Sequence, residues 1–179
     1  MNRLALTLRP AALETPTSFL SRLAARNGCP DKVSFCYDLG LDLIAISNGE
    51  RSAIEDLCHF AGLPNDAFAK TAVIKTTKMS CRVGQELFEN LTLNRVEIRV
   101  CPKCQLEQHQ LSSDLWAKVH KMHWQVPQIH SCYLHNEKLL TITAKSHHIL
   151  RFDSSSAIRS AWNEIRNADS PLTADSFDN

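Results

Sequence analysis

The chain has 179 residues, of which 44% are hydrophobic and 22% charged, and its formal net charge is +1. This composition is that of a globular protein large enough to bury a core without disulfides. The near-zero charge excludes a molecule-wide field for nucleic acid, so any such surface has to be local. No run approaches the roughly 18 apolar residues of a membrane span, and the first residues do not resemble a secretory signal, so we expect a cytoplasmic protein without membrane contact.

Two helices are predicted near the start of the chain. Thr15 followed by Pro16 is typical of a helix start, and the Asn-Gly pair that ends residues 15–28 is typical of a helix end. A second, shorter helix is expected over residues 33–39. The apolar run at residues 41–46 is too brief for its period to decide between helix and strand.

A helix-turn-helix-like pair is predicted next. Apolar residues recur at helical spacing over residues 50–61, a Gly-Leu-Pro turn follows, and Asn65 could cap a second short helix through Phe68. Such a pair can read DNA, but the second helix contains an aspartate and offers only Lys70 near its end. Packing inside a helical N-terminal domain, residues 1–92, is therefore favoured over DNA reading.

The stretch from residue 69 to residue 104 is locally basic, with seven Lys and Arg residues against three Glu residues. These seven are our candidate contacts for nucleic-acid phosphates, although a run of charge is more often only solvated. The candidates are Lys70, Lys75, Lys78, Arg82, Arg95, Arg99 and Lys103.

The clearest chemical signal is a pair of metal-ligand motifs. Residues 95–100 alternate charged and apolar side chains, which predicts a strand that leads into Cys101 and Cys104. Cys132 and His135 repeat the two-residue spacing. Two ligands at this spacing can share one metal ion, because the tight turn points both of them inward. The sequence therefore predicts one structural Zn²⁺ ion bound by three cysteines and one histidine.

The predicted zinc module is a zinc ribbon over residues 93–145. Between its two ligand pairs we expect a helix at about residues 113–123, and after them a returning strand at residues 139–142. A final region, residues 146–179, is expected to contain one short helix around residues 158–165 and a partly disordered tail. The fold class is thus α+β and mainly helical.

Two alternatives stay open at the metal site. His130 lies two residues before Cys132 and could replace His135 as the fourth ligand. Cys101 and Cys104 could instead form the redox pair of a thiol oxidoreductase, although that motif should open a helix inside a β-α-β unit. Zinc is favoured, and four protein ligands leave no open coordination position, so we expect no catalytic residue and no enzyme activity.

Several short motifs follow one another along most of the chain. They are Pro16–Ala24 with Asn27 and Gly28, Val100–Cys104, Trp116 and Trp124, and Cys132–His135 with Leu139 and Leu140. Their order resembles the TniQ family of transposition proteins, which includes the TnsD-type target selectors.

The resemblance implies a helix-turn-helix-type N-terminal domain, a zinc-binding region and a non-catalytic role in choosing where a mobile element inserts. Such adaptors bind target DNA, or a targeting complex already on it, which can be RNA-guided. They recruit the AAA+ ATPase of the transposon, of the TnsC/TniB type, and homodimerisation is left open. The runner-up interpretation is a zinc-ribbon transcription regulator that binds DNA or RNA polymerase.

Overall fold

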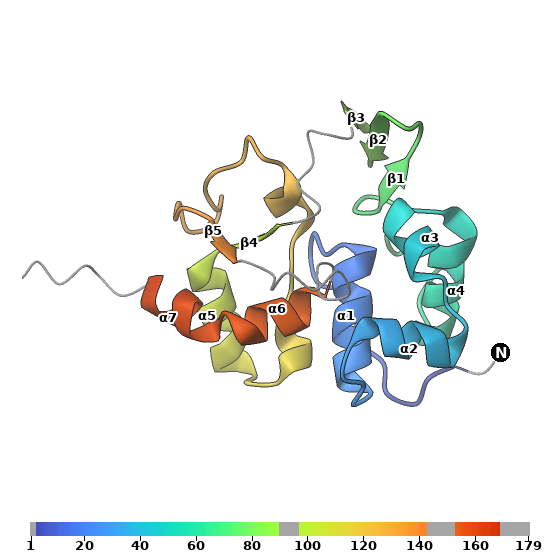
Figure 1. Ribbon diagram of the computed structural model, residues 1–179, viewed down its shortest axis with the longest axis horizontal. Helices are drawn as coiled ribbons and strands as arrows, with labels where there is room; N and C mark the ends of the chain where they lie inside the picture. Colours follow the sequence, from blue (N-terminus) through green and yellow to red (C-terminus); the bar gives the residue numbers. More distant parts are fainter. Residues whose placement is uncertain (1–2, 90–96, 143–152, 169–179) are drawn as a thin grey trace, which may run out of the picture.

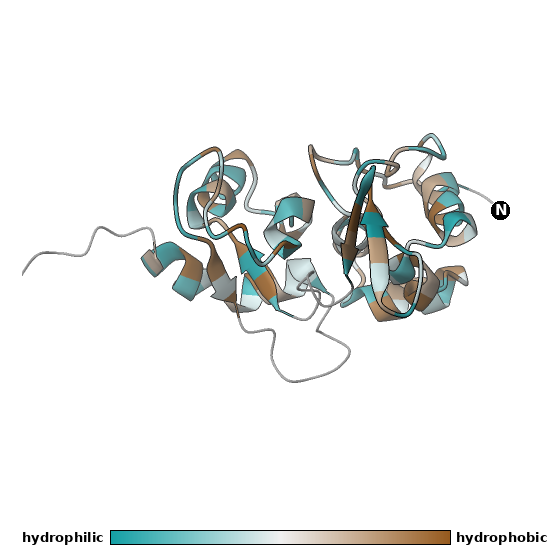
Figure 2. Ribbon diagram, turned by 90° about the horizontal axis from the view of Figure 1, so that it is seen from above, coloured by the Kyte–Doolittle hydropathy of each residue, from teal (hydrophilic) through white to brown (hydrophobic). Residues whose placement is uncertain are grey.

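The computed structural model describes residues 3–89, 97–142 and 153–168. Within these ranges the chain is α+β, as predicted, with seven α-helices and two small antiparallel sheets. Figure 1 shows the other N-terminal helices and the three-stranded sheet on one side of helix α1, and the remaining elements on its other side. Figure 2 shows hydrophobic and hydrophilic residues mixed along single elements, as expected where each element buries one face. No helix in these ranges is long and apolar enough to cross a membrane.

Four helices make up the N-terminal part: α1 (Pro16–Arg26), α2 (Lys32–Leu39), α3 (Leu43–Asn48) and α4 (Arg51–Ala61). Thr15 caps α1, because its side chain accepts a 3.2 Å hydrogen bond from the backbone N–H of Ser18. The helices predicted at residues 33–39 and 50–61 are confirmed by α2 and α4. The run left open at residues 41–46 is largely helical, as part of α3.

The apolar faces of these helices enclose one core. Phe19, Leu20 and Leu23 of α1 are fully buried in it, together with Leu57 of α4. Phe68 enters the same core, and its ring centroid lies 5.2 Å from that of Phe19. The N-terminal core therefore also includes residues that follow the four helices.

The helix predicted from Asn65 to Phe68 is wrong. Residues 65–71 form successive turns, in which the N–H of Ala67 donates to the carbonyl of Pro64 at 3.0 Å. A helix of four residues has too few hydrogen bonds to offset its nucleation cost, and burial of Phe68 fixes the path of the chain instead. The helix-turn-helix-like pair predicted here is therefore one helix followed by turns.

A three-stranded antiparallel sheet follows, which the sequence analysis does not predict. Its strands lie in the order β1 (Val73–Lys75), β2 (Ser80–Val83) and β3 (Glu86–Glu89). Cys81 and Val83 are buried while Arg82 between them is exposed, which is the alternation of a strand with one buried face. Strands of three or four residues are too short to show this alternation reliably in a sequence.

The rest of the described chain contains a two-stranded antiparallel sheet of β4 (Ile98–Val100) and β5 (Leu140–Ile142). Its α-helices are α5 (Pro102–Leu111), α6 (Ser154–Ser160) and α7 (Trp162–Ala168). The strands predicted at residues 95–100 and 139–142 are confirmed within the described residues. Buried side chains of this sheet, of α6 and of α7 form a second core. The single helix predicted around residues 158–165 is two helices, because α6 ends at Ser160 with Ala161 as its C-cap before α7 begins.

The helix predicted at residues 113–123 is wrong. Two 3-10 helices, η2 (Leu115–Ala117) and η3 (Met122–Gln125), occupy the segment, with residues 118–121 between them. Distant groups take the N–H groups that an α-helix would bond internally, and so override the helical spacing of the apolar residues. These hydrogen bonds run from Val119 to the Gln108 side chain (2.9 Å), from His120 to the Ser18 hydroxyl (3.0 Å) and from Met122 to the Leu13 carbonyl (2.8 Å).

Several predictions fall outside the described residues and stay predictions. Arg95 belongs to the undescribed residues 90–96. The boundaries predicted between the three regions of the chain fall in residues 90–96 and 143–152. The disorder predicted for the tail concerns residues 169–179.

The polar face of α1 joins the N-terminal helices to the η2 segment. Glu14, which is 1% exposed, accepts a 2.5 Å hydrogen bond from Arg22 and a 2.9 Å hydrogen bond from the hydroxyl of Ser18. Arg22 also donates to the carbonyl of Trp116 at 2.6 Å, and the Ser18 hydroxyl accepts the N–H of His120. A buried ion pair is stable only with such additional hydrogen bonds.

A second polar contact joins α1 to α6. Asp153, the buried N-cap of α6, accepts a hydrogen bond from the hydroxyl of Ser21 and a 3.1 Å hydrogen bond from the N–H of Lys32. The Ser21 hydroxyl in turn accepts the N–H of Ser155 at 3.0 Å. One helix therefore binds two segments that are more than ninety residues away in sequence.

Gly49→Ala tests the close approach of α3 to β1. A Cβ on Gly49 would lie 2.4 Å from the carbonyl oxygen of Val73. In addition, the backbone of Gly49 has a φ angle of +74°, which residues other than glycine rarely adopt. We expect the free energy of unfolding to fall by about 2–4 kcal/mol in urea denaturation. In the control Gly40→Ala, φ is +67° but a Cβ meets nothing within 4 Å, so the loss should be about 1 kcal/mol. Equal losses would contradict a tight backbone contact at Gly49.

Candidate metal centre

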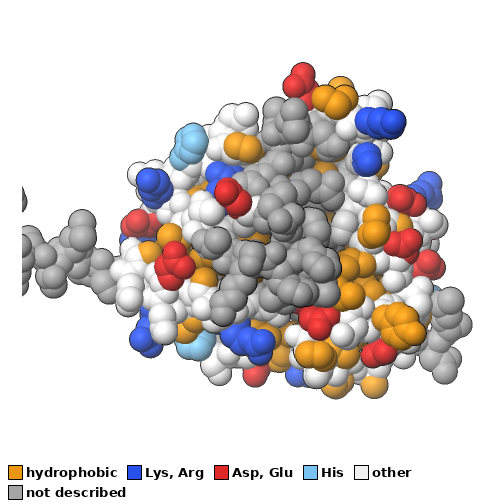
Figure 3. All heavy atoms as spheres, in the orientation of Figure 1, with side chains coloured by type: hydrophobic (Ala, Val, Ile, Leu, Met, Phe, Trp, Pro, Cys, Tyr) orange, Lys and Arg blue, Asp and Glu red, His pale blue; other side chains and the backbone are white. Residues whose placement is uncertain are grey.

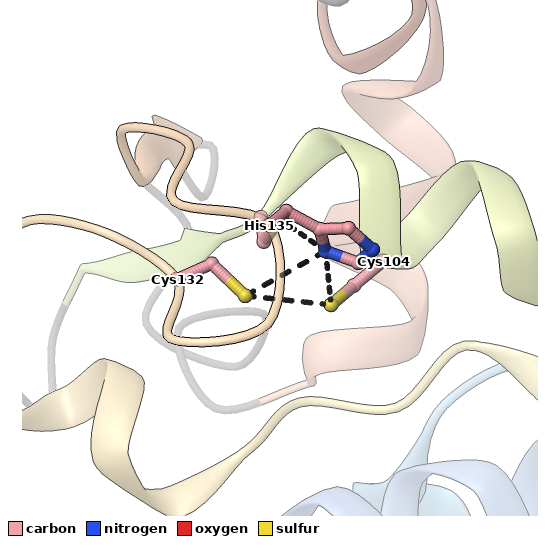
Figure 4. Close-up of side chains that lie close together, drawn as sticks. Cys104, Cys132 and His135 are labelled. Carbon is pink, nitrogen blue, oxygen red and sulfur yellow. Dashed lines mark hydrogen bonds between the residues drawn. The ribbon is translucent and has the colours of Figure 1, made fainter.

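Four side chains converge beside the two-stranded sheet. Cys101 and Cys104 come from the start of α5, and Cys132 and His135 come from the loop before β5. Their ligand atoms all lie within 4.8 Å of one another. Figure 4 shows the sulfur atoms of Cys104 and Cys132 and the imidazole ring of His135 pointing toward a common centre. The structure thus brings together the four residues that the sequence predicts as ligands.

The spacing of these atoms fits a tetrahedral metal site. The Sγ atoms of Cys104 and Cys132 are 3.7 Å apart, and Nδ1 of His135 lies 3.3 Å from Cys104, 3.4 Å from Cys101 and 3.7 Å from Cys132. A tetrahedron with bonds of about 2.3 Å to sulfur and about 2.0 Å to nitrogen has edges of about 3.5–3.8 Å. Disulfide sulfurs would be about 2.05 Å apart, and all seven cysteines are free. The group can therefore hold a metal ion.

The first pair opens helix α5, where the sequence analysis predicts only a turn. Cys101 is the N-cap with extended backbone, and the N–H of Gln105 donates to its carbonyl at 3.1 Å. Cys104 then returns to the same side of the helix as Cys101 after one turn. The amino end of a helix favours negative charge, and hence a thiolate at Cys101.

This helical start is one feature of a redox cysteine pair, but two observations disfavour such a pair. Strand β4 pairs antiparallel with β5 and not within a β-α-β unit in the described part of the chain. Two further donors, Cys132 and His135, lie within 3.7 Å of Cys104. The arrangement therefore favours a metal site over a redox pair.

The second pair lies on a tight loop closed by backbone hydrogen bonds. The N–H of Cys132 donates to the carbonyl of Glu137, and the N–H of Asn136 donates to the carbonyl of Cys132, both at 2.8 Å. Asn136 has a φ angle of 52°, in the left-handed region that asparagine tolerates better than most residues. This turn brings His135 back toward Cys132. His130 is exposed and outside the four-residue group, so the geometry favours His135.

Glu107 of α5 orients His135. Its Oε1 atom lies 2.9 Å from Nε2 of the imidazole, whose Nδ1 atom faces the sulfurs. A proton on Nε2 that is donated to the carboxylate leaves the lone pair of Nδ1 for a metal ion. Burial lowers the pKa of His135, but hydrogen bonds to Glu107, Cys132 and Cys101 outweigh it and raise the pKa to about 9.

The thiols are not equivalent in charge. A hydrogen bond from Cys104 lowers the pKa of Cys101 to about 5 against the opposing effect of burial, and the same hydrogen bond, together with burial, raises the pKa of Cys104. One thiolate therefore forms readily, whereas the next needs a cation beside it. Lys121 donates to the Sγ atom of Cys104 at 3.7 Å and offsets part of the negative charge that three thiolates would place around a divalent ion.

Two buried side chains fix the long loop between the ligand pairs. Arg99 of β4 donates to the carbonyls of Val126, Ile129 and Pro127 at 2.6, 3.1 and 3.4 Å. Gln105, which is fully buried, donates to the carbonyl of Val119 at 2.8 Å. No role for Gln105, Glu107 or Lys121 is predicted from the sequence, because their contacts cross between elements. The spacing of Glu107, three residues after Cys104 on one helix, places it on the same side of α5 as the ligands, but it does not show the contact with His135.

The seven basic candidates do not share one surface. Arg99 is turned inward, and Lys103 forms a 2.6 Å salt bridge with Glu137. Arg95 lies outside the described residues. On the face shown in Figure 3, Lys and Arg side chains are interspersed with Asp and Glu side chains. The candidates that are exposed on the turns after α4 and on the β1–β2 hairpin are Lys70, Lys75, Lys78 and Arg82.

The TniQ family model matches residues 5–139, which is most of the chain and includes all four candidate ligands. The chain belongs to the TniQ family. Among curated proteins, none matches it. TniQ proteins are associated with transposition and are generally non-catalytic. Within the Pro16–Ala24 motif, three polar residues join α1 to segments far away in sequence, and they are Ser18, Ser21 and Arg22.

Substitution of one ligand should release one metal ion per chain from this TniQ protein. Cys132→Ser and His135→Ala each remove a donor, so we expect loss of the metal, measured by mass spectrometry of the purified protein, and a lower unfolding temperature. Cys29→Ser and His130→Ala are the controls, since neither residue belongs to the group, and both should keep the ion. A metal-free wild type, or loss in His130→Ala in place of His135→Ala, would contradict this assignment.

Glu107→Gln tests the orientation of His135. The amide can still accept the Nε2–H hydrogen bond but has no charge, so metal affinity in chelator competition should fall about tenfold. Glu137→Gln is the matched control, because Glu137 pairs with Lys103 at the surface beside the same loop, and it should change affinity by about twofold at most. A similar loss in both variants would indicate a general charge effect instead of an oriented imidazole.

Proposed function

We propose that this TniQ protein is a non-catalytic adaptor that helps select the target site in DNA transposition. It binds target DNA, or a targeting complex on that DNA such as an RNA-guided one, and recruits the AAA+ ATPase of the transposon, of the TnsC/TniB type. The observation that carries the proposal is the family match over residues 5–139. A homodimer is compatible with this role.

The ion in the metal centre is Zn²⁺ in this proposal. Three thiolates and one imidazole are a donor set typical of zinc, and the spacing of the donors fits its bond lengths. Four protein ligands leave no open position, so the ion would act in folding and not in a reaction. We interpret the region as an elaborated zinc ribbon in which the first ligand pair opens a helix.

An adaptor has to hold its partners at a fixed separation, and the polar face of α1 supports that role. Hydrogen bonds from Arg22 to Trp116 and from Ser21 to Asp153 connect the N-terminal helices to the metal-binding part. A partner bound to one part would therefore be held in a defined position relative to a partner bound to the other. This rigidity suits a protein that links a target complex to an ATPase.

The proposed phosphate contacts come from the exposed basic residues at Lys70, Lys75, Lys78 and Arg82, with Lys103 and Arg95 as further candidates. Each neutralised phosphate contributes to a salt-dependent affinity that carries no sequence information. So few contacts would give weak, non-specific DNA binding. We therefore propose that protein partners supply most of the selection.

Transposition in cells tests the adaptor role. When the chain is deleted from the mobile element that encodes it, insertions at the selected site should fall to background, and wild-type protein should restore them. Cys132→Ser should fail to restore them, because the metal-binding part unfolds, while Cys29→Ser should succeed. The purified AAA+ ATPase should also bind wild type and the Cys29→Ser variant. An unchanged number and distribution of insertions after deletion would exclude the proposed role.

A further inference from the structure

A cleft of about 720 Å³ lies between the N-terminal helices and the β1–β2 hairpin. Residues 65–71, where turns replace the predicted second helix of the helix-turn-helix pair, contribute to its lining. Its walls are the end of α3, the start of α4, residues 65–72, β1 and β2. The volume is within the range of protein sites for small molecules and peptide side chains. None of the four candidate metal ligands lines it.

The floor of the cleft is apolar and is built from small side chains beside large ones. Ile54 and Phe68 are buried and belong to the N-terminal core. Ala69 and Ala72 line the cleft as well. Because an alanine ends at Cβ, these two positions leave room that a larger side chain would fill. The floor would therefore accept an apolar side chain from outside.

Backbone packing fixes one end of the cleft. Gly49, which lines it, approaches the carbonyl of Val73 so closely that a Cβ would lie 2.4 Å from that oxygen. The contact holds the end of α3 against β1. The cleft is thus a fixed feature of the packing between these elements, and its shape does not depend on flexible side chains alone.

Charge is divided between the two walls. Glu50 and Asp66 lie on the wall made by α4 and the turns, and Lys75 and Arg82 lie on the wall made by the β1–β2 hairpin. Two further charges, on Arg51 and Glu55, form a 2.7 Å ion pair with each other. Phosphates can contact Lys75 and Arg82 from outside, but a nucleic acid that entered the cleft would also bring phosphates close to Glu50 and Asp66, which disfavours its binding there. A ligand with both charges and an apolar middle would match the walls and the floor.

We propose that this cleft binds a short segment of a partner protein in which an apolar side chain is flanked by a basic and an acidic side chain. The apolar side chain packs on Ile54 and Phe68. The basic side chain faces Glu50 and Asp66, and the acidic side chain faces Lys75 and Arg82. The site is a further interaction surface, and its existence does not depend on the proposed role in transposition.

Short random peptides displayed on phage and selected on the full chain test the site. Selection should enrich peptides with the basic–apolar–acidic pattern, and a synthetic copy should bind wild type in fluorescence anisotropy. Ala69→Trp fills the cleft at an exposed position, so affinity should fall about tenfold or more. Ser52→Trp adds the same indole to an exposed position of α4 that does not line the cleft, and affinity should stay within about twofold.

Charge variants keep the test decisive if Ala69→Trp does not fold. Asp66→Lys should weaken binding and Lys75→Glu should do the same, whereas a peptide with its two charges exchanged should prefer the double variant. The proposal would be overturned if no pattern is enriched, or if none of these variants changes binding. A DNA duplex that loses affinity for Ala69→Trp, with no peptide bound, would also overturn it. Because the selection uses this chain alone, failure of the adaptor role in cells would be a separate result.

Discussion

The buried polar face of α1 is the constraint on which the arrangement of the molecule depends. Glu14 and Arg22 are both nearly inaccessible to water, and removing two charges from water costs more than their mutual attraction returns unless other groups complete their hydrogen bonds. Here Ser18 and the carbonyl of Trp116 complete them. The pair is therefore stable only while the η2 segment lies against α1, which fixes the orientation of one part of the molecule relative to the other.

The residues that follow η2 connect the polar face of α1 to the candidate metal centre. Two side chains of α5 form hydrogen bonds with the backbone of Val119. Its N–H donates to the side chain of Gln108, and its carbonyl accepts a hydrogen bond from the side chain of Gln105. The next residue, His120, bonds Ser18 of α1. Helix α5 begins with two of the candidate metal ligands, so the candidate metal centre, this helix and α1 are linked through Val119 and His120. Strands β4 and β5 have three residues each and could not hold this geometry without the surrounding contacts.

The parts of the structure that the sequence predicts well are those set by neighbouring residues. Thr15 and Pro16 define the start of α1 locally. The Cys-x-x-Cys and Cys-x-x-His spacings identify four candidate ligands, and the fold brings their ligand atoms within 4.8 Å of one another. The predictions fail where contacts with residues distant in sequence determine the local structure. Residues 113–123 have a helical pattern, but their N–H groups bond other elements. Likewise, nothing near Glu107 in sequence shows that its carboxylate meets the ring of His135.

The turns after α4 change what the N-terminal part of a TniQ protein can be expected to recognise. A reading helix needs an exposed face with side chains that reach base edges and phosphates. In its place the chain has residues 65–71, of which Phe68 serves the core while Asp66 adds an acid beside the few available lysines. What this surface offers is a recess with an apolar floor and opposite charges on its walls. These properties match the partner segment proposed for the cleft, and recognition of such a segment would depend on its shape and charge more than on the sequence of DNA.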